Sequence, residues 1–479
     1  MRRTSFAWWI FLLALLLRLV PVLVTRSLGI GLDDMFQYDM LARSLANGNG
    51  FRWYALQDLR MLQPYVDFDL TQVAYDPVRG VPTSFRAPLY PAFLAAVYLV
   101  AGTGPGRFFA ARLAQALLGA LLAPLTYHVA RRLIPGWAQA AKLSAWIVAG
   151  YPMLLLYPIG LATENLFFPL ALASFLVLLK TAEAPSWRNF ALSGFLLALT
   201  ALTRSVIALF AIAAVLWAWG VLKERRGALL MALVMLVVVS PWVVRNSLLH
   251  HRLSGIEASL GYNLYLGYHP QGDGSFVFGP SLDLLSVLDD AERNRLGTAR
   301  ALAFIRADPG RVLPLALNRL GFFMGLEKRV LMYFYSNNLL GYLPTPALLA
   351  LAAVMLLPFV LVAPAAVAGL GTLRSEPGEL LLLLLLAAYT LPHVLILAED
   401  RFHLALVPYL AVLAAYVWTG GWRDLVARWR ESLSGRAVVG LALAAACLLF
   451  LNWGLELAWD ADKIAALLGP NGNQTFFPY

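Results

Sequence analysis

The sequence has little cysteine and little charge. Its single cysteine, Cys447, lies in an apolar run, so the chain can form no intrachain disulfide and no metal site built from cysteines. Charged residues make up 13% of the chain and hydrophobic residues 60%, with a mean hydropathy of +0.70. A soluble globular chain is about 25% charged and about 45–50% apolar. These proportions exclude a soluble globular protein and indicate a polytopic membrane protein.

The motifs of familiar soluble enzymes are also missing. The sequence contains no Walker loop, no G-x-G-x-x-G that opens a βαβ unit and no H-E-x-x-H. The neighbouring His250 and His251 have no further ligands at the spacing that a metal site needs. Binding of ATP or of a nucleotide sugar by a familiar soluble module is therefore not expected, and no metal ligand set is predicted.

The net charge of +10 is explained by membrane topology. Much of the lysine and arginine falls in short loops between apolar runs, as the positive-inside rule expects, so nucleic acid is not an expected partner. Arg2 and Arg3 place the N-terminus in the cytoplasm. The apolar run 6–24 is too long for a signal peptide and no small-residue cleavage site follows it, which predicts an uncleaved first span.

The remaining apolar runs predict an all-α protein with eleven spans. Run 88–102 is short and rich in proline and glycine at its ends. It is predicted to be a surface helix, because only then do all basic-rich short loops fall on the cytoplasmic side. The predicted spans are 6–24, 108–130, 138–157, 161–180, 188–203, 205–222, 228–244, 344–371, 379–398, 402–419 and 437–457.

This topology predicts one transmembrane domain over residues 1–457. It has two external parts, a first external loop at 25–103 with surface helices and a second external region at 245–343. The tail 458–479 is then external as well. The sequence shows no internal repeat and no soluble domain of separate composition.

Two adjacent carboxylates, Asp33 and Asp34, follow the first span. The apolar residues after them recur at helical spacing, which predicts an amphipathic helix on the membrane surface. Asp34 and Tyr38 are four residues apart and so share a face of this helix. Aspartate at a helix start is an ordinary N-cap, and the residues alone leave capping and catalysis open.

Other unusual polar residues fall on the same predicted side of the membrane. They lie at external ends of spans or in external loops: Arg86, Glu164, Arg204, Arg245, Glu399, Asp400 and Arg401. Ionisable groups at membrane depth usually face a cavity or one another, and the planar, permanently charged fork of arginine suits phosphate. A pocket with both acids and arginines fits an anionic, lipid-linked substrate whose reaction needs a base.

Several of these residues also have simpler explanations. Arg86 could snorkel to lipid headgroups, Glu164 could cap a helix N-terminus, and Arg401 could form only a local ion pair. For Arg204 and Arg245, anchoring at the membrane interface explains the position equally well.

Two further residues are less informative. His393 is a single histidine in an apolar segment, a setting that is more often structural. Arg18, in the first span, could snorkel or could pair with an acid of the following loop.

In their order and spacing, these residues resemble the GT-C membrane glycosyltransferases, in the branch with the protein O-mannosyltransferases and the lipid A aminoarabinose transferase. In that family an acidic pair follows the first span, with a tyrosine four residues after the key aspartate, as for Asp34 and Tyr38 here. A basic residue before Pro-Leu-Tyr binds the carrier phosphate there. Arg86 and Tyr90 match that motif, with arginine for the usual lysine. Further residues in segments similar to family landmarks are Glu164, Arg204, Arg245, Asn263 and Arg401.

The resemblance implies a GT-C fold and an inverting transfer of a hexosyl or pentosyl group from a polyprenyl-phosphate sugar donor. The acceptor would be a hydroxyl of a lipid, a glycan or a protein, at the external face of the bacterial cytoplasmic membrane. Asp34 is the predicted base, with Asp33 as the other candidate. The predicted substrate-binding residues are Tyr38, Arg86, Tyr90, Glu164, Arg204, Arg245, Asn263, His393 and Arg401.

No cofactor is required by this scheme, because arginines can neutralise the leaving phosphate, and the sequence leaves dependence on a divalent metal open. The alternative is a lipid-linked sugar transporter or flippase without transferase activity. Such a protein would also need arginines over a phosphate, but it would have no use for an acid–tyrosine pair on an external surface helix.

Overall fold

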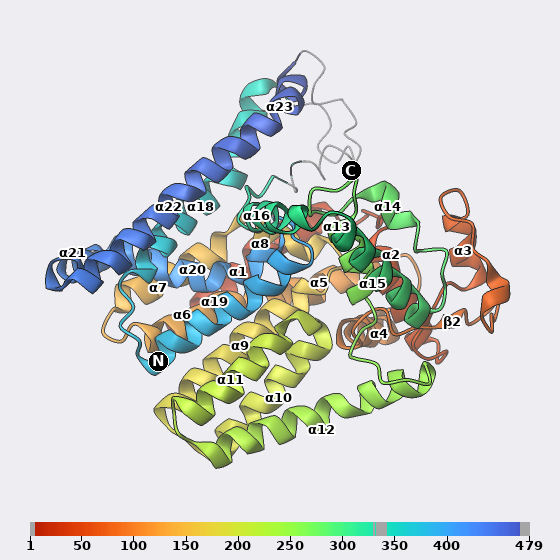
Figure 1. Cartoon of the computed structure of the whole chain (residues 1–479), viewed down its shortest axis with the longest axis horizontal. Helices are drawn as coiled ribbons and strands as arrows, with labels where there is room; N and C mark the ends of the chain where they lie inside the picture. The colour runs from red at the N-terminus through yellow and green to blue at the C-terminus, as the bar shows by residue number, and fades with distance from the viewer. Residues whose placement is uncertain (1–4, 329–330, 332–342, 470–479) are drawn as a thin grey trace.

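The computed structural model describes residues 5–328, 331 and 343–469, and this part of the chain is built almost wholly of helices (Figure 1). Within it, the one sheet is an antiparallel pair of two-residue strands, β1 (Arg52–Trp53) and β2 (Val81–Pro82). The predicted all-α character is therefore confirmed.

Seven helical segments of the described chain are long and apolar enough to cross a membrane. They are α1 (Phe6–Val24), α5 with α6 (Arg107–Ala120 and Leu122–Leu133), α9 (Glu164–Glu183), α12 (Arg225–Leu249), α18 (Thr345–Leu370), α19 (Pro377–Leu395) and α22 (Leu433–Trp459). A bent pair adds an eighth if it is one span. It consists of α7 (Ala138–Gly150) and a second arm of α8 (Pro152–Leu156) and η2 (Tyr157–Ile159), with a bend of 51°.

Shorter helices occupy the other three predicted spans. These are α10 (Trp187–Thr203), η3 with α11 (Ser205–Ile207 and Ala208–Gly220), and α20 (Val407–Tyr416), which is flanked by η5 (Phe402–Ala405) and the π-helical turn η6 (Val417–Gly421). The polytopic class is thus confirmed, and the number of eleven spans stays a prediction.

The interior of the molecule is organised around α20. Every residue from Val407 to Ala415 is buried, and the helix packs against α6, α7 and α18. A helix that is apolar on all sides belongs in the interior of a bundle. The loop that carries Arg401 enters this central helix through η5, so its position is tied to the core.

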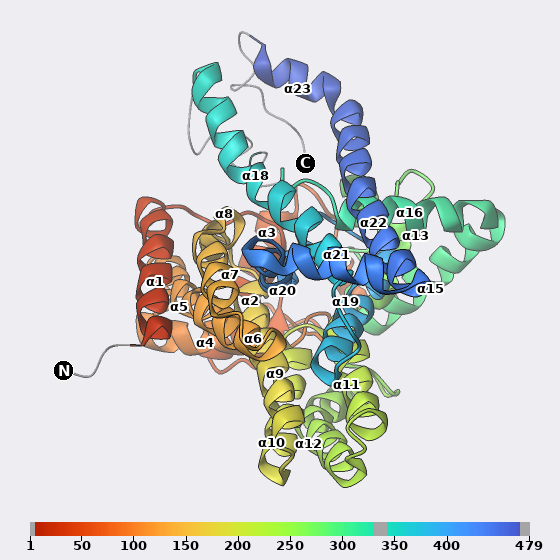
Figure 2. The ribbon, with the colours of Figure 1, turned by 90° about the vertical axis from the view of Figure 1, so that its left-hand side faces the viewer.

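The predicted surface helices gather at one end of the bundle. α2 (Asp34–Ala46) packs against α4 (Leu89–Ala101) and β1, and α13 (Leu260–Tyr268) packs against α15 (Asp290–Ala307). With α3 (Leu56–Leu62), η1 (Leu70–Gln72), α14 (Phe278–Leu282), η4 (Pro309–Arg311) and α16 (Val312–Phe323), they make up the segments that are predicted to be external. In Figure 1, α2, α3, α14 and α15 lie on the side opposite α21 (Trp422–Glu431), which is in front in Figure 2; α23 (Ala461–Leu468) follows α22.

α4 is too short to cross a bilayer on its own. Its 13 residues correspond to about 20 Å of helix, against about 30 Å of hydrocarbon. Tyr90, Leu94 and Tyr98 are buried on its inner side. The length agrees with the prediction of a surface helix, while the side of the membrane on which it lies stays a prediction.

The structure corrects the prediction for Arg18. Its side chain is fully buried and donates hydrogen bonds to the carbonyl oxygens of Ala14 (3.0 Å), Val148 (3.3 Å) and Ala149 (3.4 Å). It therefore does not snorkel, and within the described part of the chain it pairs with no acid. The reason is the bend after α7: a helix end leaves carbonyl oxygens without partners in the helix, and Arg18 binds two of them.

Candidate active site

The two adjacent aspartates after the first span have different partners. Asp33 is the N-cap of α2, and its Oδ1 accepts a hydrogen bond from the backbone N–H of Met35 at 2.8 Å. Asp34 is the first residue inside the helix, and its carboxylate is not needed for the cap. The capping explanation therefore applies to Asp33 and leaves Asp34 to face other side chains.

Asp34 contacts two arginines that are distant from it in the sequence. Its Oδ1 accepts a hydrogen bond from Nη2 of Arg86, and its Oδ2 lies 3.7 Å from Nη2 of Arg401. The side chain is still 41% exposed. Asp34 is thus an ion-paired carboxylate that an incoming molecule can reach.

Residues in the first two turns of α2 also contact Arg86. Its Nε donates a hydrogen bond to Oε1 of Gln37 at 2.9 Å, and its guanidinium carbon lies 5.2 Å from the ring centre of Tyr38. Asp34, Gln37 and Tyr38 are three or four residues apart, so they share one face of the helix. Asp34 and Tyr38 thus share a helix face, as predicted, and both contact Arg86.

A second acid–arginine pair lies beside the first. Glu164 is the first residue of α9, and its Oε1 accepts a hydrogen bond from Nη1 of Arg204, the residue that follows α10. Its Oε2 accepts a hydrogen bond from the hydroxyl of Thr163 at 3.0 Å. Glu164 is therefore not only a helix-end charge, because it neutralises Arg204.

Arg401 connects the two pairs. Its Nε lies 2.7 Å from Oε2 of Glu399, in addition to its approach to Asp34. The charges of Arg204 and Arg401 act on both Asp34 and Glu164. Arg401 therefore has a local ion pair, as one interpretation held, and is also part of the larger cluster. We call Asp34, Arg86, Glu164, Arg204 and Arg401 the acid–arginine cluster.

The cluster separates the acidities of the two aspartates. Desolvation by the surrounding protein and the charge of Asp34 raise the pKa of Asp33 above its ordinary value of 3.8. Desolvation also acts on Asp34, but the charges of Arg86 and Arg401 outweigh it and lower the pKa of Asp34. Burial raises the pKa of Tyr38 to about 12, so its phenol stays protonated at neutral pH and can donate a hydrogen bond.

Two of the predicted site residues lie behind the cluster. Tyr90 is fully buried, with its ring edge-on to Tyr38 at 5.1 Å and its hydroxyl donating to Oε1 of Gln115 at 2.5 Å. Arg245 donates hydrogen bonds to the carbonyl oxygens of Thr83 (2.5 Å) and Phe51 (3.3 Å). Tyr90 therefore contacts α2, which carries Asp34, and Arg245 contacts the segment just before Arg86. That either residue binds substrate stays a prediction.

Two more predicted site residues are not joined to the cluster by hydrogen bonds among the described residues. His393 is buried in α19, and its ring stacks on Phe402 at 4.5 Å and on Phe323 at 5.5 Å. Asn263 lies on α13, and its backbone N–H bonds to Ser259. The aromatic packing of His393 agrees with its structural interpretation.

Two contacts were not predicted. Gln37 holds Arg86, and Glu257 accepts hydrogen bonds on Oε1 from the N–H (3.2 Å) and the hydroxyl of Ser205, next to Arg204. The charge of Glu257 also acts on Arg86. Gln37 could have been found from its place three residues after Asp34, whereas no local pattern marks Glu257.

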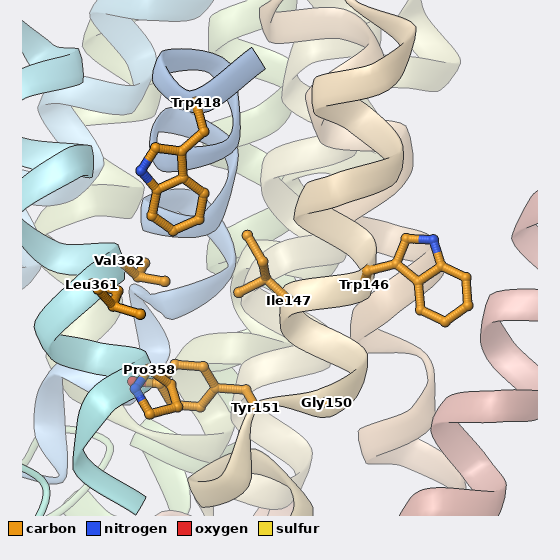
Figure 3. Close-up of a pocket in the computed structure, with 8 residues that line it drawn as sticks. All are labelled: Trp146, Ile147, Gly150, Tyr151, Pro358, Leu361, Val362 and Trp418. Atoms are coloured by element: carbon orange, nitrogen blue, oxygen red, sulfur yellow. The ribbon is translucent and has the colours of Figure 1, made fainter. Parts of the chain in front are cut away.

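The described chain also has an apolar pocket of about 330 Å³ away from these charges (Figure 3). It is lined by Trp146, Ile147, Gly150, Tyr151, Pro358, Leu361, Val362 and Trp418. None of these residues belongs to the acid–arginine cluster, and the ionisable one among them, Tyr151, donates its hydroxyl to Oε1 of Glu327 at 2.5 Å. Among the described residues, no group of three or more His, Cys, Asp or Glu side chains could hold a metal ion.

A family model described as dolichyl-phosphate-mannose-protein mannosyltransferase matches residues 85–244. This is a GT-C family, so the predicted resemblance to GT-C glycosyltransferases is confirmed for this segment. The segment contains Arg86, Glu164 and Arg204. Asp34 and Arg401 lie outside it, and the fold brings both of them to the matched residues.

Solved structures of an oligosaccharyltransferase and of ArnT are similar to the chain. The Archaeoglobus fulgidus oligosaccharyltransferase in complex with Zn and sulfate has 15% identity and a TM-score of 0.47, over 99% of this chain and 57% of its own. The same protein, AglB, with an inhibitory peptide and a dolichol-phosphate, has 15% identity and a TM-score of 0.46, over 98% and 60%. ArnT from Cupriavidus metallidurans bound to undecaprenyl phosphate has 15% identity and a TM-score of 0.39, over 89% and 81%.

The chain therefore spans less than two thirds of the length of the oligosaccharyltransferase. All three TM-scores are below 0.5. No curated protein matches the chain.

Proposed function

We propose that this protein transfers a sugar from a polyprenyl-phosphate donor to an acceptor hydroxyl at the external face of the bacterial cytoplasmic membrane. The observation that carries the proposal is the contact of one accessible carboxylate, Asp34, with Arg86 and Arg401, while the adjacent Asp33 caps the helix. The family match over residues 85–244 supports the class of reaction.

Asp34 is the general base in this proposal. The acceptor hydroxyl gives its proton to the Asp34 carboxylate as its oxygen attacks the anomeric carbon of the donor. The bond between that carbon and the phosphate oxygen breaks, and the polyprenyl phosphate leaves with the bonding electrons. A single displacement of this kind inverts the anomeric centre.

Arginine charge stabilises the leaving phosphate. Arg86 has two nitrogens engaged, Nε with Gln37 and Nη2 with Asp34, and the planar fork of arginine suits a phosphate group. Tyr38 and Gln37 keep the guanidinium in place while its partner changes. A phosphate that binds Arg86 also competes with Asp34 for positive charge, which makes the Asp34 carboxylate a stronger base when the donor is bound.

The contact between Asp34 and Arg86 also favours a transferase over a flippase. A flippase needs cations over a phosphate and must release the lipid unchanged, so it gains nothing from an accessible base beside them. In this chain the carboxylate lies on the same cation that is proposed to hold the phosphate. That arrangement favours transfer.

The test compares Asp34→Asn with Asp33→Asn in cells and after purification. Mass spectrometry of cell-envelope lipids and glycans, with and without the protein, identifies the transferred sugar and its acceptor. Asparagine and aspartate cap helices about equally well, so both variants are expected to fold. Asp34→Asn should lose about 10²–10⁴-fold in transfer rate, the usual contribution of general-base catalysis, while Asp33→Asn keeps most of it.

Binding of polyprenyl phosphate to each variant is the control, since loss of binding would indicate a defect in assembly. Full transfer by a folded Asp34→Asn protein would remove Asp34 as the base. An inactive Asp33→Asn beside an active Asp34→Asn would move the base by one residue.

A further inference from the structure

At the end of the bundle opposite to α2 and α15, the helix α21 connects elements that belong to the membrane-spanning part (Figures 1 and 2). It is followed directly by α22, and its Arg428 donates hydrogen bonds to the carbonyl oxygens of Gly371 (3.0 Å) and Leu373, just after α18. Both α18 and α22 are long and apolar enough to cross a membrane. α21 therefore lies where two such helices end, at the level of the membrane boundary.

One side of α21 is attached to the protein. Besides Arg428, Asp424 accepts a hydrogen bond from the hydroxyl of Tyr416, and Glu431 pairs with Arg374 at 2.9 Å. Both acids of the helix are thus occupied by partners within the chain. These contacts fix the rotation of α21 about its axis and decide which side chains point outward.

The outward side is apolar in the middle and basic at its edge. Trp422, Val426 and Trp429 are 51%, 40% and 45% exposed, and their spacing of four and three residues makes one stripe. Arg423 and Arg430 are exposed next to the stripe, seven residues apart on one flank. Amphipathic helices with tryptophan on one face and arginine beside it lie in the membrane interface.

We propose that this face of α21 binds anionic phospholipid headgroups, with Trp422, Val426 and Trp429 at the upper ends of the acyl chains and Arg423 and Arg430 on the lipid phosphates. The membrane is the expected occupant because α21 is joined to helix ends at the membrane boundary. The charge also fits: both outward arginines lack an acid on their own helix, since Asp424 and Glu431 are occupied. The site is independent of the sugar-transfer reaction and lies at the opposite end of the bundle.

The first test measures lipid selectivity. The purified full-length protein is placed in phosphatidylcholine nanodiscs, and the apparent affinity for added phosphatidylglycerol is measured. An arginine near an anionic surface contributes about 1 kcal/mol, or roughly five-fold in affinity, so Arg423→Gln with Arg430→Gln should lose roughly 25-fold. The matched control is Arg295→Gln with Arg306→Gln, an exposed pair on α15, a helix that contains no tryptophan. Equal loss in both double variants, or no loss in the first, would overturn the proposal.

The second test measures the position of the apolar stripe. In a Cys447→Ser background, which removes the only native cysteine, a nitroxide is attached at Val426→Cys or, as a control, at Arg295→Cys on the exposed part of α15. The Val426 label should collide more often with oxygen, which dissolves in the bilayer, than with a water-soluble nickel complex, and the Arg295 label should show the reverse. A Val426 label that favours the nickel complex, or that neither reagent reaches because another protein covers it, would contradict lipid binding.

Discussion

At the scale of single residues, the same side-chain type does two different jobs at adjacent positions. Asp33 is tied to a backbone N–H of its own helix, whereas Asp34 has only side-chain partners, Arg86 and Arg401. A backbone partner does not change when a substrate binds, but a guanidinium can exchange a carboxylate for a phosphate. This difference in partner is the reason for proposing Asp34, and not Asp33, as the residue that responds to the donor.

The role of Arg86 predicts a difference between two substitutions. Arg86→Ala should weaken binding of polyprenyl phosphate by about 10- to 100-fold, as for the loss of a hydrogen bond to a charged group worth ~1.5–3 kcal/mol. Arg86→Lys keeps the charge and loses only the planar fork, so its loss should be smaller. Binding to the detergent-solubilised protein checks this, with Arg295→Ala on the exposed surface as the control. Unchanged binding in both variants would make Arg86 a headgroup anchor.

Arg86 also sets the pH dependence that we expect. Asp34 accepts a proton only when it is ionised, and its ionised fraction falls as pH falls through its pKa. Because desolvation of Asp34 is outweighed by the charges of Arg86 and Arg401, its pKa lies below 3.8, and kcat/KM of the parent should show no acidic limb at mildly acidic pH. Arg86→Gln removes a charge that lowers the pKa of Asp34, so the acidic limb should move to higher pH. Superimposable profiles would exclude Asp34 as the titrating base.

At the scale of elements, the segment before Arg86 is held by the second external region. Asp290, buried in the first turn of α15, accepts hydrogen bonds from the hydroxyl of Thr83 (2.6 Å) and the N–H of Ser84 (2.7 Å), and it pairs with Arg293 at 3.0 Å. Arg86 follows Ser84 by two residues. The position of Arg86 is therefore set from both sides, by α2 and by α15.

This arrangement predicts that Asp290 acts on donor binding through Arg86. Asp290→Asn should weaken binding of polyprenyl phosphate in the parent and have little further effect in an Arg86→Ala background, because coupled residues are not additive. Asp289→Asn is the matched control, since asparagine keeps the N-cap of the same helix. A full additional loss in the Arg86→Ala background would mean that Asp290 acts only on stability.

At the scale of the whole molecule, the acid–arginine cluster joins parts that are far apart in the sequence. Asp34 and Arg401 lie on either side of the family-matched segment 85–244, which supplies Arg86, Glu164 and Arg204. The central helix α20 fixes the Arg401 loop, and the ends of α9 and α10 bring in the second pair. No single segment of this fold contains the whole acid–arginine cluster.

The predicted topology places this site outside the cell. With the N-terminus in the cytoplasm and α4 on the surface, the loop at Thr103 should be external. In a Cys447→Ser protein, a cysteine at position 103 should react with a membrane-impermeant reagent added to intact cells. A cysteine at Arg188, at the predicted cytoplasmic end of span 188–203, should react only after permeabilisation. If position 103 were labelled only after permeabilisation, it would be cytoplasmic, and the prediction that α4 is a surface helix would be wrong.

Local features of the sequence were enough to predict the membrane class, the helix after the first span and the shared face of Asp34 and Tyr38. Hydrophobic runs, helical spacing and loop charge are properties of neighbouring residues, so they can be read without the fold. The alternation of apolar spans and polar loops also predicted that the unusual polar residues lie at one end of the spans.

Other features depend on contacts between distant segments. Only the folded chain pairs Asp34 with Arg401, places Glu257 beside Ser205, and buries Arg18 against the open carbonyls at the end of α7. The folded chain also decides that Asp33, and not Asp34, is the N-cap of α2. A helix that began one residue later would fit the local sequence equally well. Packing selects among partners that the sequence leaves equivalent, and that selection makes one of two identical carboxylates the accessible partner of two arginines.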